Sequence, residues 1–478
     1  MTLKSNRFSH YSLWTLCKFS CLLLIFICSL LSACNDSSNT DKQNKSSASS
    51  KAYTPRGFFG DMQSSDAFTS VERNTYVELP EDHKSHPDFQ LEWWYLTFVL
   101  SSENGQEFGL QYTLFRFNSD AAPNKLTNGP AMRSWANGQQ WMGHASLHTL
   151  THHYFEERFA SGGVGNAYVR TNPFTTVIDD WVWKAAQTMP GTKANIDRRA
   201  MFPSTLSFAF GQQSTRETNE SLEVSSPHPT EAFPKYADAQ NTEAFKASPV
   251  DSQLNNGRTT KNNAVKVALD LDSLGPFIKQ GDNGYSKKTQ DERLRSYYYS
   301  QPFINAKGTV NIKGNNIKVE GKGWFDHEWT SHLANSEALG WDWFSLHLSD
   351  GSKLMAFRMH SNTDSEEKSE TKNAEVFTTA SFITKNGMKE TIEQSNLSIT
   401  PTDYELIKQN GEQGNENDSS ARLVPTAWRI KLPTKEIDIS VRAFKEKQWN
   451  NSLFPYYEGR VEVEGSHSGS GFMELTGY

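Results

Sequence analysis

Residues 91–98 read LEWWYLTF, and the segment built around them decides the fold. An aromatic and apolar run covers residues 91–100, the turn formers Glu103-Asn104-Gly105 follow, and a second run covers residues 108–117. Two such runs separated by a short polar turn predict an antiparallel β-hairpin.

Side chains of a β-strand alternate between two faces, which divides the first run into two sets. One face carries Glu92, Trp94, Leu96 and Phe98, and the other carries Trp93, Tyr95 and Thr97. A carboxylate beside indoles on an inward face is desolvated, and desolvation raises its pKa toward that of a usable general acid.

The same hairpin pattern recurs along the chain. It is repeated over residues 308–321, with a turn at Gly314-Asn315-Asn316, and over residues 341–359, with a turn at Ser349-Asp350-Gly351. Helical periodicity is scarce, and residues 175–188 are the candidate for a short helix. Many short antiparallel strands in two halves predict an all-β protein made of barrels or sandwiches.

Composition narrows the class of protein. The chain has 478 residues, a net charge of −7 and 12% aromatic residues. An acidic chain argues against a nucleic-acid partner, because phosphate binding needs clustered Lys and Arg. All four cysteines, Cys17, Cys21, Cys28 and Cys34, lie near the start. The remaining chain therefore offers no disulfide, thiol nucleophile or cysteine-based metal site.

The first residues predict an export signal. Basic residues precede an apolar run of about 11 residues, which is too short to span a bilayer and typical of a signal-peptide core. The run ends in Leu31-Ser32-Ala33-Cys34, which resembles a bacterial lipobox. That resemblance implies acylation of Cys34, with palmitate among the chains, and a membrane anchor. Asn35 favours the periplasmic face of the outer membrane. The alternative is an ordinary secretory signal with a chance cysteine.

Polar segments suggest the domain organisation. We expect a signal peptide at 1–33, a flexible tether at 34–60, an N-terminal domain at 61–295 and a C-terminal domain at 296–478. A polar insert of the first domain covers about 213–263.

A second tryptophan-rich strand contains several ionisable groups. Residues 323–329 read GWFDHEW, and GWDWF follows at 340–344. Alternation places Trp324, Asp326 and Glu328 on one face and Phe325, His327 and Trp329 on the other. Adjacent ionisable groups between tryptophans are costly unless they are paired or functional. The alternative is that the indoles only pack and the carboxylates bind neighbouring backbone or Arg groups.

These segments, with Glu92-Trp93-Trp94-Tyr95, Tyr297-Tyr298-Tyr299-Ser300 and the final GFMELTGY at 471–478, resemble the AttH-like family. This family includes carotenoid 1,2-hydratases and a group labelled "predicted secreted hydrolases". The resemblance implies two packed lipocalin-like barrels, each able to enclose an apolar ligand, and no cofactor. It also implies addition of water to an isolated carbon–carbon double bond.

The implied site combines acids with aromatic groups. Asp326 or Glu328 would protonate the substrate, and His327 would orient the acid or accept a proton from water. The residues expected to bind the substrate are Glu92, Trp94, Tyr95, His144, Tyr298, Trp324, Trp329, Trp341, Asp342 and Trp343.

Metal and serine-hydrolase sites find little support. His327 and His332 are five residues apart, whereas the helical zinc-protease motif needs a spacing of four. A second group, His144, His148, His152 and His153, has only Glu156 as a nearby carboxylate, and a polar strand face with an inward His144 is favoured. No G-x-S-x-G sequence is present. We therefore expect no metal.

Two non-enzymatic functions stay open. Lipocalin-like barrels also carry lipids or other hydrophobic molecules, and family members near transporters suggest an ABC transporter as a partner. In that case the acids and His327 have a structural role and hold the barrels together where they meet. The third alternative is a protein-interaction module that uses the polar insert for docking.

Overall fold

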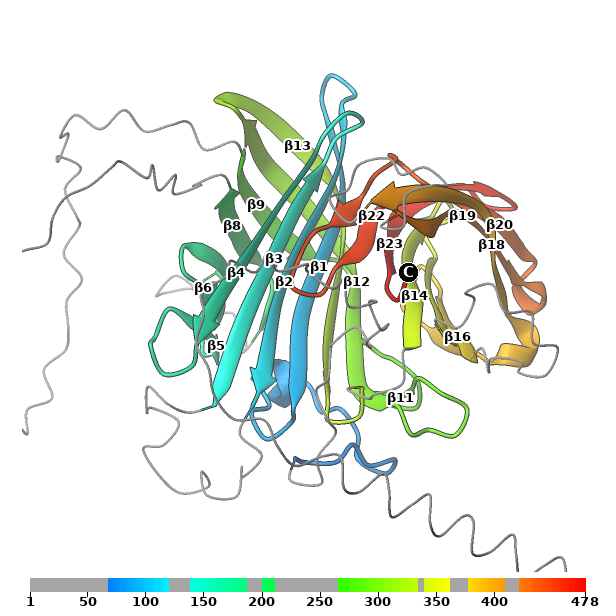
Figure 1. Cartoon of the computed structure of the whole chain (residues 1–478), viewed down its shortest axis with the longest axis horizontal. Coiled ribbons are helices and arrows are strands. Elements are labelled where there is room, and N and C mark those ends of the chain that lie inside the picture. Colours follow the sequence, from blue (N-terminus) through cyan, green and yellow to red (C-terminus); the bar gives the residue numbers. More distant parts are fainter. Residues whose placement is uncertain are drawn as a thin grey trace, which may run out of the picture. The chain divides into compact units, whose positions relative to one another are not determined.

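The computed structural model describes residues 68–119, 138–186, 200–210, 265–333, 339–361, 377–408 and 421–478. The expected signal peptide with Cys34, the tether and the polar insert lie outside these ranges. Within them the chain is almost entirely β-structure, as predicted (Figure 1). The helices described are the short 3-10 turns η1 (Glu81–His83), η4 (Gln394–Asn396) and η5 (Pro433–Lys435). No helix in the described part of the chain has the length and apolarity needed to cross a bilayer.

The first sheet runs in the order β4-β3-β2-β1-β13-β12-β9-β8-β7-β6-β5, and β10 and β11 pair with β12. Its strands are β1 (Leu91–Ser102), β2 (Glu107–Asn118), β3 (Gln139–His148), β4 (His153–Ser161), β5 (Ala167–Thr171), β6 (Phe174–Ile178), β7 (Trp181–Ala185), β8 (Ser204–Phe210), β9 (Val265–Ser273), β10 (Ile278–Lys279), β11 (Tyr285–Lys287), β12 (Arg295–Ile312) and β13 (Asn315–Thr330).

The second sheet runs in the order β17-β16-β15-β14-β23-β22-β20-β19-β18, and β21 pairs with β22. Its strands are β14 (Leu339–Leu348), β15 (Lys353–Ser361), β16 (Phe377–Ile383), β17 (Lys389–Ile392), β18 (Ser398–Lys408), β19 (Ala421–Leu432), β20 (Ile437–Ala443), β21 (Trp449–Asn450), β22 (Tyr456–Gly465) and β23 (Gly469–Leu475).

The first sheet nearly closes into a barrel. Arg158 on β4 donates from Nη2 to the carbonyl of Ala209 on β8 at 3.2 Å, and its guanidinium lies 4.2 Å from the centre of the Trp181 ring on β7. These contacts join the edge strand β4 to β7 and β8, which lie near the other end of the sheet order. Arg158 therefore helps to close the barrel where no backbone hydrogen-bond ladder connects these strands.

All three predicted hairpins are confirmed as β1–β2, β12–β13 and β14–β15. The β12–β13 turn uses Lys313 at φ 51° and Gly314 at φ 90°, a pair of left-handed residues that suits a tight hairpin. The short helix expected at 175–188 was wrong. Residues 174–185 form β6 and β7 instead, because a β-branched run precedes a turn at Asp179 and Asp180.

The described chain changes sheet between β13 and β14. Strands β12 and β13 therefore belong to the first sheet, although the sequence analysis placed residues 296–478 in the C-terminal domain. The limits of independently folding domains stay a prediction.

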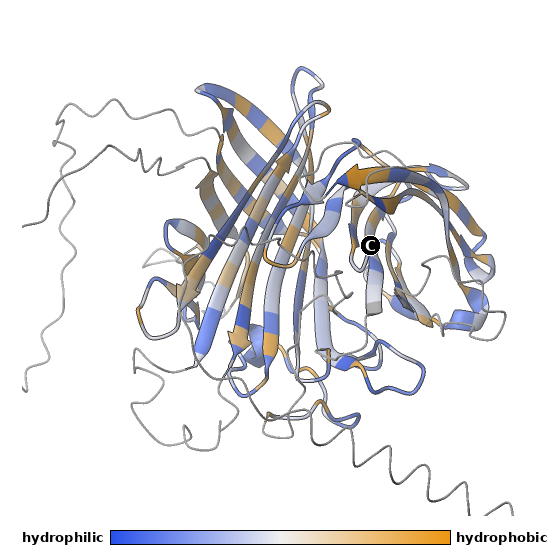
Figure 2. Ribbon diagram, viewed as in Figure 1, coloured by the Kyte–Doolittle hydropathy of each residue, from blue (hydrophilic) through white to orange (hydrophobic). Residues whose placement is uncertain are grey.

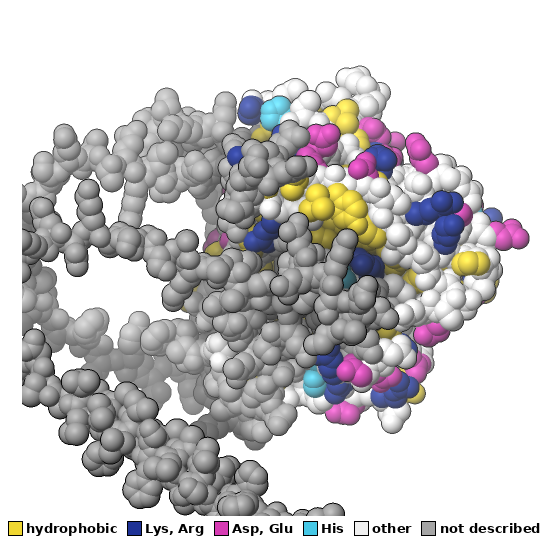
Figure 3. Space-filling model, turned by 45° about the vertical axis from the view of Figure 1, so that its right-hand side comes forward, with side chains coloured by type: hydrophobic (Ala, Val, Ile, Leu, Met, Phe, Trp, Pro, Cys, Tyr) yellow, Lys and Arg dark blue, Asp and Glu magenta, His cyan; other side chains and the backbone are white. Residues whose placement is uncertain are grey.

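Apolar side chains form three clusters. One fills the first barrel around Trp94 and Phe325, and another fills the second sheet around Phe344 and Trp428. The third, around Tyr95, Tyr298 and Trp343, lies between the sheets. Figure 2 shows the matching alternation of apolar and polar residues along the strands. On the face drawn in Figure 3, charged side chains of both signs surround a group of hydrophobic ones.

Close backbone approach joins the two sheets. A Cβ added to Gly109 on β2 would lie 2.7 Å from Cβ of Arg460 on β22, so only glycine fits there. The Arg460 guanidinium forms an ion pair with Glu107 at 2.6 Å.

Candidate active site between the two sheets

A pocket opens between the two sheets. Its empty volume is about 600 Å³ when the open space at its mouth is counted. It is lined by Trp93, Tyr95, Thr113, Phe115, Lys288, Tyr298, Asp326, Glu328, Leu333, Trp341, Trp343, Phe357, Met359 and Glu474. The walls are therefore largely aromatic, and three carboxyl groups are set into them.

Strand register brings the first-sheet residues together. In the β1–β13 pairing Trp93 lies opposite Glu328, and Tyr95 lies opposite Asp326. Directly opposite residues of an antiparallel pair point to the same face. The alternation predicted for both tryptophan-rich strands is thus confirmed, and one face of each lines the pocket.

Asp326 is a buried acid inside this aromatic wall. Its Oδ1 accepts hydrogen bonds from Ser300 Oγ at 2.5 Å and from Trp324 Nε1 at 2.8 Å. Burial raises the pKa of Asp326 to about 7, although both hydrogen bonds favour the charged form. Near neutral pH the group can therefore hold a proton and release it.

Glu328 lies two residues further along the same face but has a cationic partner. Lys288 Nζ is 2.8 Å from its Oε1, and Ser296 Oγ donates to the same oxygen at 2.5 Å. The Lys288 ammonium also lies 4.7 Å from the centre of the Tyr298 ring. A carboxyl with a cationic partner and a carboxyl without one thus lie on the same face of β13, and two carboxyls in different surroundings are typical of acid–base sites.

Glu474 enters the pocket from the second sheet. Its Oε1 accepts the Trp341 indole N–H at 2.8 Å. Burial, together with the charge of Glu328, raises the pKa of Glu474 to about 7. Behind it lies Glu458, whose pKa burial and the charge of Glu474 raise well above its usual range. Tyr95 donates its hydroxyl to Glu458, so the second sheet contributes acids as well.

The aromatic walls are fixed by their own contacts. Trp343 Nε1 donates to the Tyr298 hydroxyl at 3.2 Å, and the Trp343 ring meets Tyr95 edge-on at 5.3 Å. Rings held in this way keep their π faces in place, and π faces attract cations.

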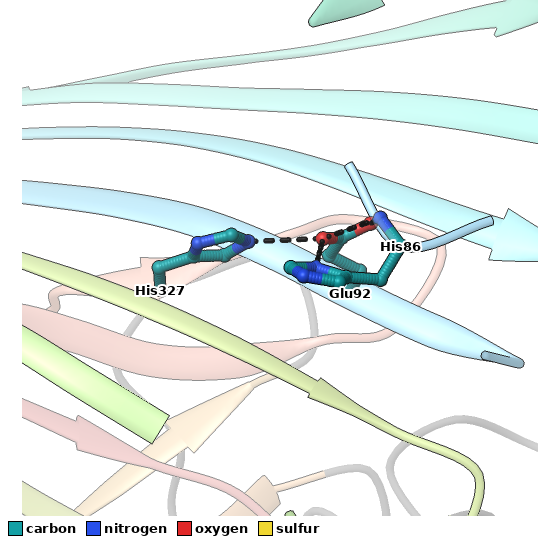
Figure 4. Close-up of side chains that lie close together, drawn as sticks. All are labelled: His86, Glu92 and His327. Atoms are coloured by element: carbon teal, nitrogen blue, oxygen red, sulfur yellow. Dashed lines mark hydrogen bonds and ion pairs between the residues drawn. The ribbon is translucent and has the colours of Figure 1, made fainter. Parts of the chain in front are cut away.

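The opposite face of the same strands carries a separate cluster inside the first barrel (Figure 4). Glu92 Oε1 lies 2.9 Å from His327 Nε2 and 2.7 Å from His86 Nδ1, and Arg116 Nε lies 2.8 Å from Oε2. Trp94 stacks on His327, and Trp329 stacks on His86. Although burial opposes it, the charges of Arg116 and His86 hold the pKa of Glu92 well below its usual range.

His86, Glu92 and His327 are the one group of described residues with the spacing of a three-ligand metal site, since their ligand atoms lie within 4.8 Å of one another. The ring nitrogens that face Glu92, His327 Nε2 and His86 Nδ1, are hydrogen-bonded to it, and the other ring nitrogens also have partners. His327 Nδ1 faces the Tyr299 hydroxyl at 3.0 Å, and His86 Nε2 faces Asp82 at 3.3 Å. An ion would also have to compete with Arg116 for Glu92, so the donor set fits a hydrogen-bonded tie better than a metal centre.

Comparison with known proteins decides the family. The AttH-like family model matches residues 70–243 and 207–478. The chain belongs to the AttH-like family. A protein assigned as AttH from Nitrosomonas europaea shares the fold, with a TM-score of 0.58 and 24% identity over 86% of this chain and 100% of that one. Kievitone hydratase from Nectria haematococca has a TM-score of 0.49 and 12% identity over 87% and 96%. No curated protein sequence matches significantly.

The AttH-like pocket unites only part of the residues predicted for it. Those that line it are Tyr95, Tyr298, Asp326, Glu328, Trp341 and Trp343, and Trp324 supports Asp326 by a hydrogen bond. Glu92, Trp94, His327 and Trp329 lie on the opposite face, in the barrel cluster. The proposed contact of His327 with the acid therefore has no geometric basis, because strand alternation separates it from both neighbours.

Two other predicted binding residues lie elsewhere. Asp342 points away from Trp341 and Trp343, pairs with Arg358 at 2.7 Å and accepts the Tyr478 hydroxyl at 2.8 Å. His144 is buried between the sheets, bound to Tyr456 and Glu157.

Sequence reasoning missed several pocket residues of the AttH-like site. Glu474 belongs to the quoted C-terminal motif, and its position beside apolar neighbours could have marked it as a buried acid. Lys288 follows β11 in a polar segment that resembles any exposed turn. Its pairing with Glu328 depends on the tertiary fold, which no local pattern encodes.

Proposed function

We propose that the pocket between the sheets binds an apolar, unsaturated small molecule and adds water to a carbon–carbon double bond. The single observation that carries this proposal is Asp326, a buried acid with a pKa raised to about 7 in an aromatic pocket. Membership of the AttH-like family supports it, because the sequence resemblance implied a hydratase-like reaction.

The chemistry runs in two steps. Asp326 gives its proton to one alkene carbon, which leaves a carbocation on the other carbon and a carboxylate on Asp326. A water molecule then forms the new carbon–oxygen bond and loses a proton to Glu328. Proton return to Asp326 restores the starting state, since both carboxyls lie on the same face of β13. No other reactant is consumed.

The cation needs shelter between the two steps. The π faces of Tyr95, Trp341 and Trp343 and the negative charge of Glu328 would stabilise it. The aromatic walls also exclude bulk water, which would quench the cation without control.

Labelled water tests the reaction. Wild type is extracted with detergent and incubated in water enriched in oxygen-18, and the co-purifying apolar molecules are analysed by mass spectrometry. We expect uptake of one labelled water in wild type and in Glu320→Gln, a change at an exposed position on β13, but not in Asp326→Asn. Equal uptake in Asp326→Asn would contradict the proposal.

A non-enzymatic lipid carrier is the second candidate, and the largely apolar lining of the pocket favours it. Under this reading the bound molecule leaves the protein unchanged and takes up no label. The same mass-spectrometric experiment therefore separates the two functions.

We also propose that the protein acts at the cell envelope, held by acyl chains on Cys34. The lipobox-like residues 31–34 support this, because two or three acyl chains on the cysteine supply stable attachment. An ABC transporter is the partner that would deliver or accept an apolar molecule there. Metabolic labelling with a palmitate analogue, lost in Cys34→Ser, tests the anchor.

A further inference from the structure

A line of hydrogen bonds crosses from the outside of the first sheet to the back of the pocket. It begins at Glu157 on β4, whose Oε1 lies 2.9 Å from His144 Nε2. The other ring nitrogen of His144, Nδ1, lies 2.9 Å from the Tyr456 hydroxyl on β22. His144 is thus bonded through both nitrogens, once to each sheet.

The line continues to the pocket wall. Tyr456 hydrogen-bonds Glu458, two residues along β22. Glu458 accepts the Tyr95 hydroxyl, and Tyr95 lines the pocket beside Asp326. Glu458 also lies directly opposite Glu474, which lines the pocket itself.

The middle of this series of hydrogen bonds is shielded from solvent, whereas one end is exposed to solvent and the other reaches the pocket. His144 and Glu458 are fully buried, and the edges of Phe115 and Phe155 meet the His144 ring at 5.2 and 5.3 Å. The Glu157 side chain is 17% exposed, which gives it contact with solvent. One end therefore meets water and the other meets the pocket.

We propose that Glu157, His144, Tyr456 and Glu458 form a proton relay that supplies the pocket from the side away from its mouth. A mouth filled by an apolar ligand blocks solvent, so a second route for protons has a clear use. This use rests on the proposed function, whereas the relay itself does not.

The transfer balances with one proton. The transfer starts when a proton from water reaches Glu157. At that point His144 Nδ1–H faces Tyr456, and the Tyr456 hydroxyl faces Glu458, which is ionised once its own proton has left for the pocket. Glu157 gives its proton to Nε2, Nδ1–H passes to the Tyr456 oxygen, and the Tyr456 proton passes to Glu458. Glu157 then takes a new proton from water. The hydrogen bonds reset when each group turns back to its first state.

The surroundings of His144 and Glu458 allow each of them to accept a proton. Burial lowers the pKa of His144, although Glu157 opposes the shift, so the ring is neutral and can accept a proton. Around Glu458 the facing polar groups are Tyr95 on β1, Asn450 on β21 and Glu474 on β23. None of these three is a cation that would hold Glu458 ionised.

Time-resolved infrared spectroscopy tests the relay without any substrate. The pH of a detergent solution of the full chain is lowered rapidly from alkaline to mildly acidic. The infrared band of the C=O bond in protonated carboxyls is then followed over time. Glu458→Gln and Glu474→Gln assign the band. Tyr456→Phe removes the relay hydroxyl with little change of shape. Tyr457→Phe is the matched control, since Tyr457 lies on the other face of β22 and its hydroxyl contacts Lys445 and Gln448, which are not part of the relay.

We expect protonation of Glu458, which does not line the pocket, to be at least about tenfold slower in Tyr456→Phe and in His144→Asn, and unchanged in Tyr457→Phe. Equal rates in wild type and Tyr456→Phe would overturn the relay, whatever the outcome of the labelled-water experiment. If Tyr456→Phe fails to fold, His144→Asn decides by the same criterion. If Asp326→Asn abolishes the uptake of labelled water while Tyr456→Phe leaves the infrared protonation rate unchanged, the relay is wrong and the proposed function stands.

Discussion

Glu458 on β22 and Glu474 on β23 lie directly opposite each other, and a buried pair of carboxyls cannot both ionise at low cost. Burial and the charge of Glu474 raise the pKa of Glu458, and burial and the charge of Glu328 raise the pKa of Glu474 to about 7. Each sheet thus brings an acid with a pKa near 7 to the pocket, since Asp326 belongs to the first and Glu474 to the second. The pocket keeps protons at a pH where exposed carboxyls have lost them.

The Glu474 pKa predicts a specific dependence of stability on pH. A carboxyl with a raised folded-state pKa keeps its proton after the unfolded chain has lost it, so its contribution to stability falls as pH rises from about 4.5 to about 7. Glu474→Gln should remove this fall and be more stable than wild type above that window, by at most about 3 kcal/mol. Urea unfolding at both ends of the window measures it. Glu464→Gln, at an exposed position on β22, should follow wild type.

Asp326 predicts the pH profile of the proposed reaction. A general acid acts in its protonated form, and burial raises the pKa of Asp326 to about 7. The initial rate of labelled-water uptake should therefore fall as pH rises through about 7, by about tenfold per unit above it. A rate that increases over this range would mean that a deprotonated group limits the reaction.

Much of the fold followed from local patterns. The hairpin signals placed three strand pairs, and alternation separated the residues of each tryptophan-rich strand into the correct two faces. What alternation cannot tell is which face meets another sheet. Both faces of β1 and β13 are buried, one in the barrel and one against β14 and β23, so Glu92 and Asp326 looked equally suited to one site.

The site depended on long-range pairings that local patterns do not contain. Glu474 reaches the pocket only because β23 lies between β14 and β22. Asp342 was predicted to bind substrate because it sits between two tryptophans, yet its parity turns it toward Arg358 and Tyr478. Polar residues in a fully buried strand can serve either face, and the partner that satisfies them comes from a distant segment.

The barrel cluster predicts a large effect of losing Arg116. Its guanidinium binds Glu92 and the carbonyls of His86 and Phe89, all out of contact with water. Arg116→Met leaves a buried carboxylate without its main counter-charge and should cost about 3 to 5 kcal/mol of unfolding free energy. Arg429→Met breaks the exposed pair with Asp438 and should cost about 1 kcal/mol or less. Similar losses in both variants would show that Glu92 is not held as a charge.

The same cluster predicts indifference to metal. Because His86 and His327 are both hydrogen-bonded to Glu92, a chelator should leave the thermal midpoint unchanged, and added zinc should not raise it. Thermal unfolding monitored by circular dichroism measures both. A zinc-dependent rise that is lost in His327→Gln would instead identify a three-ligand site at His86, Glu92 and His327.

Filling the pocket should weaken ligand binding without touching the acids. Leu333 lines the pocket and is partly exposed, so Leu333→Trp can place an indole in the cavity at little cost to the core. The affinity for anilinonaphthalene sulfonate, an apolar fluorescent probe, should fall by about tenfold or more, which corresponds to about 1.4 kcal/mol. Leu274→Trp, at a side chain that is 65% exposed and lines no part of this pocket, is the control. Unchanged probe affinity in Leu333→Trp would mean that the probe, and by extension an apolar ligand, binds outside the space between the sheets.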